Sequence, residues 1–370
     1  MPFSQVLAQD IPITLLRRSI MTEQVGHAYL FFGPEGIGKR TTALAFAKAL
    51  NCTDEASRAQ GDFCDVCRSC RMITLGQHPD VRLFTPETTG GKTVIPIDAI
   101  RTKIGESSSH PLPLREDARL KPLEGRRKVY ILDPANRPGL QEDAGNALLL
   151  VLEEPPPYVT IILISSRPSA VLPTLISRCS PMRFQLAQRE PTLQAILSLG
   201  TASPEEASAI AGMAAGRIGW ALSVAANPQA LQVRQALFAD IDRLLPAGRP
   251  AALRLAETLH RLAASTSLST EAEEDDGKAR TSADRQVRKN LPELLDMTAS
   301  WWRDLLVTVL GEPDMRINAD FAAQLDRHAH RLSSQQLRDG LHAVMQAKRM
   351  IERNANIDLA LERMWMAMLP

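Results

Sequence analysis

A glycine-rich run that ends in lysine is the segment with the clearest chemistry. Residues Gly33–Lys39 read GPEGIGK and lie between the apolar run Ala28–Phe32 and the Ala- and Leu-rich stretch Thr42–Leu50. A strand, such a run and then a helix predict a phosphate-binding P-loop, in which backbone N–H groups approach the phosphates and Lys39 reaches the outer ones. The glycines are Gly33, Gly36 and Gly38. A plain glycine-rich turn is the alternative, and the match in both sequence and context argues against it.

Two positions that a working nucleotide site needs are altered. The Ser or Thr that ligates Mg²⁺ directly after the lysine is replaced by Arg40, and Thr41 comes one residue late, about 100° away around a helix. Asp133 ends the apolar run Lys128–Asp133, where a metal-binding carboxylate is expected, although a carboxylate that only caps the next turn is the alternative. Pro134 follows and offers no base to activate water. The sequence therefore predicts a degenerate site with weakened binding of ATP or ADP and of Mg²⁺.

Four cysteines form a second cluster. Cys52, Cys64, Cys67 and Cys70 have the spacing C-x11-C-x2-C-x2-C. Four thiolates complete a tetrahedral zinc shell with no open position, so the role predicted for zinc is structural. A set of ordinary reduced thiols is the alternative, but free cysteines rarely cluster at these spacings. Cys179 stands apart and is expected to be a small buried side chain.

Composition restricts the class of protein. The chain has 370 residues, enough for two or three domains, and a formal net charge of +1, which gives no global field to hold a polyanion. Any contact with DNA must then be local or made by a partner. Arg126, Arg127 and Lys128 are candidates for such a contact, although a solvated lead-in to a strand is the alternative. No signal peptide and no apolar run of roughly 18 residues stands out, so a cytoplasmic location without a membrane partner is expected.

The pattern of strands and helices that must position these residues indicates an α/β domain followed by helices. Strand candidates alternate with helical stretches such as Gln141–Glu153, which indicates a parallel sheet covered by helices. The strand candidates are Ala28–Phe32, Val81–Phe84, Val129–Asp133 and Val159–Ile164. After Gln188 the strand signals stop. Capped helix starts at Ser203 and Asn227 and leucine stripes follow, with Trp301 and Trp302 expected in the core and a mobile acidic connection at Ser267–Asp284.

Four segments together resemble one family. They are HAYLFFG at His27–Gly33, the four-cysteine module, NALLLVLEEPP at Asn146–Pro156 and SRC at Ser177–Cys179. This combination resembles the bacterial clamp-loader subunits of the AAA+ class, which serve DNA polymerase III in DNA replication. The resemblance covers nearly the whole chain, although 86–123 matches less clearly, and Asn354–Glu362 is similar to the family's final collar helix. It implies an AAA+ domain over 1–187 with the zinc module at 52–70, a small helical lid over 188–245 and a helical collar over 246–370.

The resemblance also implies roles for single residues. Arg178 takes the place of an arginine finger that enters the nucleotide site of a neighbouring subunit, with a surface salt bridge as the alternative. Ser165 or Ser166 takes the sensor-1 place. Gly219 stands where motor subunits carry a sensor-2 arginine, and Arg217 comes two residues early. A chain that lacks the hydroxyl after Lys39, a glutamate base at the position of Pro134 and the sensor-2 arginine, but keeps the finger, is expected to complete the site of another subunit.

The partners that the resemblance implies are those of a hetero-oligomeric ring. They are gamma/tau motor subunits and a delta subunit, with the sliding clamp and primer-template DNA engaged through the complex. No intrinsic ATPase activity is expected, although the chain would form part of a DNA polymerase holoenzyme. An active motor is one alternative, opposed by Arg40, Pro134 and Gly219. A stand-alone AAA+ repair protein is the other, opposed by the cysteine module together with the collar-like end.

Overall fold

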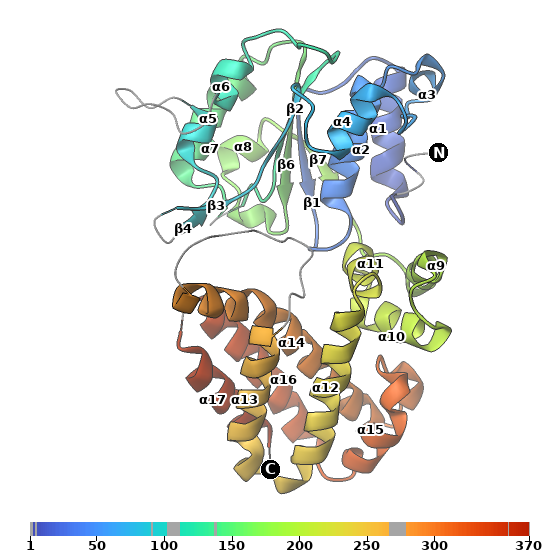
Figure 1. Cartoon of the computed structure of the whole chain (residues 1–370), viewed down its shortest axis with the longest axis vertical. Coiled ribbons are helices and arrows are strands. Elements are labelled where there is room, and N and C mark those ends of the chain that lie inside the picture. The colour runs from blue at the N-terminus through green and yellow to red at the C-terminus, as the bar shows by residue number, and fades with distance from the viewer. Residues whose placement is uncertain are drawn as a thin grey trace. The chain divides into compact units, whose positions relative to one another are not determined.

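The chain forms two compact units. The computed structural model describes residue 3 and residues 6–89, 92–101, 112–136, 139–265, 279–353 and 355–369. The first unit comprises Met1–Gln188 and Arg217–Gly219, and the second comprises Arg189–Gly216 and Trp220–Pro370 (Figure 1). The finer division into AAA+, lid and collar domains stays a prediction.

A five-stranded parallel sheet forms the centre of the first unit, in the order β2-β5-β6-β1-β7. The strands are β1 (Ala28–Phe32), β2 (Val81–Phe84), β5 (Lys128–Leu132), β6 (Val159–Ser165) and β7 (Ser180–Arg183). The predicted parallel sheet is therefore confirmed. All residues of β5 and β6 are buried, as expected of central strands covered on both faces. The edge strand β7 was not predicted, because its sequence SPMR carries no apolar run and three of its four residues are exposed.

Helices cover both faces of this sheet (Figure 1). Alternate side chains of each strand point to opposite faces, so Tyr29 and Phe31 pack with α2 while Ala28 and Leu30 pack with α7. The helices are α1 (Asp10–Met21), α2 (Lys39–Asn51), α3 (Glu55–Ala59), α4 (Arg68–Thr74), α5 (Ile97–Ile100), α6 (Leu114–Asp117), α7 (Glu142–Glu153), the 3-10 turn η2 (Pro168–Ala170) and α8 (Pro173–Ile176). A separate hairpin pairs β3 (Glu87–Thr89) with β4 (Lys92–Val94).

All regular secondary structure among the described residues of the second unit is helical. Their helices are α9 (Arg189–Leu199), α10 (Pro204–Ala214), α11 (Ile218–Ala225, whose first two residues group with the first unit), α12 (Pro228–Leu244), α13 (Ala252–Ser265), α14 (Ala279–Val309), α15 (Ala322–Ala329), α16 (Ser334–Glu352) and α17 (Ile357–Met368). Short 3-10 turns are η3 (Leu245–Ala247), η4 (Arg249–Ala251), η5 (Pro313–Met315) and η6 (Ala319–Phe321). Trp301 and Trp302 are fully buried, which confirms their predicted place in the core. The capping box at Ser203 and the cap at Asn227 are also present.

Three expectations need comment. Helix α14 begins at Ala279, so the predicted connection Ser267–Asp284 was drawn too long at its end, and 266–278 lie outside the described residues. Lys128 was expected to be solvated or to contact DNA, and this was wrong, because its side chain is buried and its ammonium pairs with Asp117. Among the residues that the structure describes, none of the helices is long and apolar enough to cross a membrane.

Candidate functional site

The glycine-rich loop leaves β1 and ends at the first residue of α2. Gly33, Gly36 and Gly38 all have positive φ, at 147°, 70° and 93°. A Cβ on Gly33 would lie 2.5 Å from the carbonyl oxygen of Phe184, so glycine is required there by both space and backbone conformation. Gly38 is the N-cap residue of α2 and has no side chain to cap the helix. The first N–H groups of α2, with their partial positive charge, are therefore free of side-chain caps, as in a phosphate-binding loop.

The side chain of Lys39 is bonded to the backbone of the glycine-rich loop. Its ammonium donates a hydrogen bond to the carbonyl oxygen of Gly33 at 2.8 Å and another to that of Pro34. The residue is buried, and this burial lowers the pKa of Lys39, while the charges of Asp133 and Glu35 act in the opposite direction. The lysine is thus placed at the loop where it can exchange carbonyl partners for phosphate oxygens.

The two positions that would hold Mg²⁺ are joined to each other. The Arg40 Nε donates to Asp133 Oδ2 at 2.6 Å, with the side chains 38% and 17% exposed. Asp133 directly follows β5, and its N–H donates to the carbonyl of Phe84 in β2. A guanidinium has no lone pair to give a metal, and it occupies the carboxylate that would be the second protein ligand. The residues present therefore do not fit Mg²⁺. Thr41 is exposed.

The end of β6 supplies the two candidate sensor serines. Ser165 is buried, and its hydroxyl donates to the side-chain oxygen of Asn136 at 3.1 Å. The hydroxyl of Ser166 instead donates to Glu35 in the glycine-rich loop at 3.0 Å. Both serines therefore contact the loop, Ser166 through its side chain and Ser165 through its backbone carbonyl, which accepts from the N–H of Gly33 at 3.2 Å.

Gly219 also contacts the loop, within the first unit. Its N–H donates to the carbonyl oxygen of Gly36 at 2.7 Å. A Cβ at this position would lie 3.0 Å from the same oxygen, a tight contact that a shift of a few tenths of an ångström would relieve. An arginine at 219 would therefore require the loop or α11 to shift.

Arg178 lies at the surface directly after α8. Its guanidinium donates to Glu153 Oε1 at 2.7 Å and to the carbonyl oxygen of Thr174 at 3.0 Å, and its side chain is 35% exposed. Glu153 is the last residue of α7 and belongs to the LEEPP segment. The structure thus contains the surface salt bridge that was the alternative to the finger role, and the finger role itself stays a prediction. Cys179 is buried as predicted, and burial raises its pKa to about 12.

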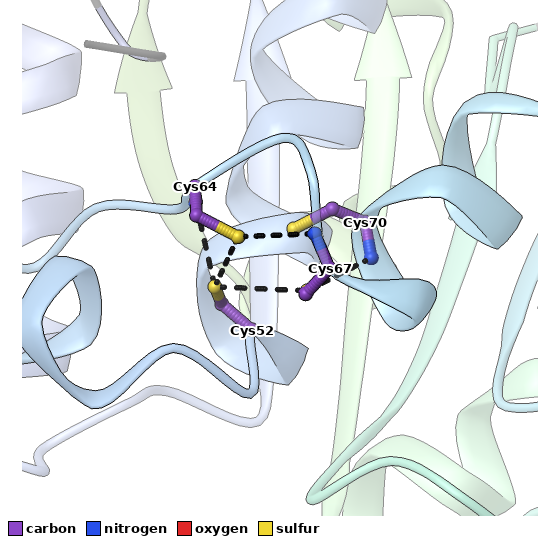
Figure 2. Close-up of side chains that lie close together, drawn as sticks. All are labelled: Cys52, Cys64, Cys67 and Cys70. Carbon is purple, nitrogen blue, oxygen red and sulfur yellow. Dashed lines mark hydrogen bonds between the residues drawn. The ribbon is translucent and has the colours of Figure 1, made fainter.

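The four clustered cysteines converge although they come from three different places (Figure 2). Cys52 is the C-cap residue of α2, Cys64 lies in the loop after α3, Cys67 is the N-cap of α4, and Cys70 lies in that helix. All four sulfur atoms lie within 4.8 Å of one another, with Cys52 3.6 Å from Cys64 and 4.0 Å from Cys67. These separations are far too long for disulfides, whose S–S bond is about 2.05 Å.

This sulfur cluster fits zinc. Thiolates at about 2.3 Å from a tetrahedral Zn²⁺ lie about 3.8 Å apart, between the two separations just given. Backbone N–H groups of Cys64, Cys67 and Cys70 also point at sulfur atoms of the cluster, at 3.3–3.4 Å. Such donors stabilise thiolate over thiol. Although burial opposes ionisation, hydrogen bonds involving Thr53 and Cys70 lower the pKa of Cys67 to about 6. Burial raises the pKa of Cys52 to about 11 and also raises that of Cys70, so the zinc fit rests on the geometry of the sulfur atoms.

A buried chain of polar groups connects α4 of this module to the turn before β5, the strand that Asp133 follows. The Ser69 hydroxyl lies 3.1 Å from His78 Nε2, and the Asp80 N–H donates to His78 Nδ1. The Asp80 carboxylate then accepts three N–H groups from the turn that leads into β5: Leu123, Glu124 and Gly125, at 2.7–2.8 Å. Sequence reasoning missed Asp80, because nothing local marks a carboxylate that caps a turn more than 40 residues away.

Comparison with known proteins decides the family. A family model described as DNA polymerase III, delta subunit, matches residues 8–188, and one described as DNA polymerase III, delta subunit, C terminal, matches residues 281–367. The DNA polymerase III subunit delta' of Bacillus subtilis (strain 168) is 28% identical over 95% of this chain and 93% of its own length. The delta' subunit of Pseudomonas aeruginosa is 38% identical over 42% of each chain. The chain belongs to the family of DNA polymerase III delta-prime subunits.

Other members of the same machinery are also related to this delta-prime family chain. The DNA polymerase III subunit tau/gamma of Haemophilus influenzae is 34% identical over 51% of this chain, but the match spans only 24% of that longer protein. A solved structure described as a gamma subunit-related protein from Thermotoga maritima aligns with a TM-score of 0.41 at 16% identity, covering 92% of this chain and 99% of that one. That likeness is too low to bear on the fold. The roles of Arg178, the zinc ligands and the nucleotide ligands stay predictions.

Proposed function

We propose that this chain is a clamp-loader subunit of DNA polymerase III that does not hydrolyse ATP and that supplies Arg178 to the nucleotide site of a neighbouring subunit. The observation that carries the proposal is the ion pair between Arg40 and Asp133. It occupies both Mg²⁺ positions of the chain's own phosphate loop. Pro134 adds a second defect, because it has no base for water. A loop so altered has little use as a motor, whereas Arg178 is at the surface and can serve another subunit.

The proposed action of Arg178 is electrostatic. Its guanidinium would neutralise charge that develops on a γ-phosphate during attack by water, and a finger supplied in trans is worth roughly 10³–10⁵ in rate. To act, it must leave Glu153. Both side chains of that pair are more than a third exposed, and such surface pairs contribute about 0.2–1 kcal/mol. The pair is therefore weak enough for a phosphate to displace Glu153, while α8 still fixes the backbone of the arginine.

The proposed partners follow from family membership. They are gamma/tau motor subunits, one of which would receive Arg178, and a delta subunit. The sliding clamp and primer-template DNA would be engaged through the assembled ring, since a net charge of +1 gives this chain no strong attraction to DNA of its own. We also propose that Cys52, Cys64, Cys67 and Cys70 hold one structural Zn²⁺, which would fix the loops of residues 52–70 around the end of α2.

The test compares substitutions in a reconstituted clamp loader. Arg178→Ala is expected to lower ATP turnover by at least about a hundredfold at the site that it serves, given the usual worth of a finger. Lys39→Ala in this chain is expected to leave turnover nearly unchanged. Arg183→Ala, which removes an exposed arginine from the neighbouring strand β7, is the matched control and should have no effect. Loss of turnover with Lys39→Ala would show that this chain is itself a motor. Normal turnover with Arg178→Ala would refute the finger.

A further inference from the structure

The degenerate phosphate loop keeps the glycines and the lysine that hold a phosphate, although the positions that hold the metal are altered. The three glycines hold the loop open at the start of α2, and Lys39 lies at it. Within and beside the loop the metal positions are altered, since a guanidinium replaces a hydroxyl and the aspartate is paired with it, while Pro134 and Gly219 change positions outside the loop. A loop that had merely decayed would have no reason to keep its glycine conformations and its lysine while placing a cation on Asp133.

The charges around the loop explain how it can work without a metal. In a metal-dependent site, Mg²⁺ offsets both the aspartate and the phosphates. Here the positive charge of Arg40 offsets Asp133 directly at 2.6 Å, so this carboxylate does not repel an incoming phosphate. Lys39 and the positive end of α2 remain to attract the anion. Glu35 is exposed at the loop and bonded to Ser166, and its charge weakens this attraction without abolishing it.

A divalent cation meets the opposite situation. It would have to displace Arg40 from a carboxylate that is only 17% exposed, and it would find no hydroxyl at position 40. The freed guanidinium would then lie beside the ion as a like charge. Mg²⁺ that arrives with a nucleotide is therefore disfavoured at this loop, whereas the bare phosphate chain is not.

We propose that this phosphate loop binds a nucleoside di- or triphosphate without a divalent cation, with the Arg40–Asp133 ion pair in the place of the metal. The inference rests on the proposed function only in taking the loop as a nucleotide site. It also gives a reason for the proposed lack of hydrolysis, because a nucleotide held without a metal lacks the charge that stabilises its transition state. Bound nucleotide would then serve as a fixed part of the subunit.

The test measures nucleotide binding to the full-length chain with ADP that carries a fluorescent ribose label. Titrations in EDTA and in excess MgCl₂ are expected to give equal affinity, or higher affinity in EDTA. Lys39→Ala should abolish binding in both, which assigns the signal to this loop. Arg40→Ser restores a hydroxyl and frees Asp133, so its binding should become at least about tenfold tighter in Mg²⁺ than in EDTA. Arg71→Ser, on the exposed face of α4, is the control and should behave like the wild-type chain.

Several results would overturn the proposal. They are a tenfold tightening of wild-type binding by Mg²⁺ (about 1.4 kcal/mol), the absence of binding in both conditions, and unchanged metal dependence in a folded Arg40→Ser chain. If Arg40→Ser fails to fold, electron paramagnetic resonance of Mn²⁺ decides the matter on the wild-type chain. With saturating ADP, the proposal requires that no Mn²⁺ be immobilised by the protein. Failure of the nucleotide-binding proposal would not affect the proposed role of Arg178, because the Arg178 experiment measures ATP turnover at another subunit's site.

Discussion

Asp80 gives the sharpest structural prediction, because one buried carboxylate holds three backbone N–H groups. The turn 123–125 donates to both of its oxygens at 2.7–2.8 Å, and Asp80 is 1% exposed. Hydrogen bonds to a charged group contribute about 1.5–3 kcal/mol each. Asp80→Asn keeps the shape but has a single acceptor oxygen, so one N–H loses its partner and the other two bonds become neutral. We therefore expect a loss of about 3 kcal/mol in the free energy of unfolding of the first unit.

The expected loss converts into a clear thermal shift. For a unit of this size, 1 kcal/mol corresponds to about 2–4 °C, so Asp80→Asn should lower its unfolding temperature by about 6–12 °C. Differential scanning calorimetry would show this shift. Tryptophan fluorescence should not, because all four tryptophans belong to the second unit and report its unfolding. Glu55→Gln, which neutralises an exposed carboxylate on α3, is the matched control and should shift the temperature far less.

The pH dependence of this loss has a definite sign. Although burial alone would raise it, the pKa of Asp80 is lowered by the N–H groups of Gly125, Leu123 and Glu124 and by His78. A carboxylate with a lowered folded pKa contributes stability above its unfolded value of about 3.9 and loses it as the pH falls through the folded value. The difference between wild type and Asp80→Asn should therefore be full at neutral pH and shrink below about pH 4. An equal shift in Asp80→Asn and Glu55→Gln, or a difference that grows in acid, would refute this reasoning.

Two further predictions concern the metal cluster and the arginine. The wild-type chain should contain about one zinc ion, and the Cys67→Ser variant should contain almost none. Cys179→Ser, which lies outside the cluster, is the control and should keep its zinc. Metal analysis of the purified proteins measures this, and a zinc-free wild-type chain would contradict the prediction. Glu153→Gln releases a surface pair of about 0.2–1 kcal/mol, so ATP turnover of the reconstituted loader should stay unchanged or rise by at most about 1.4- to 5-fold. A fall as large as that of Arg178→Ala would mean that Glu153 positions the arginine for its neighbour.

Local sequence determined the elements whose signals lie within a few neighbouring residues. Runs of β-branched and aromatic residues predicted the four strands with apolar character, and β1, β2, β5 and β6 confirm them. A capping box needs only residues three apart, so the start of α10 at Ser203 was visible from the sequence. The spacing of the four cysteines was enough to predict that they converge, because three of them are only three residues apart. The weak edge strand β7 gave no such signal and depended on pairing with β1.

Pairings between distant residues were decided only by the tertiary structure. The sequence showed that Arg40 cannot ligate a metal, but it could not show that the guanidinium lies on Asp133, 93 residues further along the chain. That contact exists because the parallel sheet brings the ends of β1 and β5 to the same edge, with only β6 between them. The ion pairs of Arg178 with Glu153 and of Lys128 with Asp117 were likewise visible only in the tertiary structure. Residue types therefore fixed which chemistry the phosphate loop had lost, while the order of the strands decided what took its place.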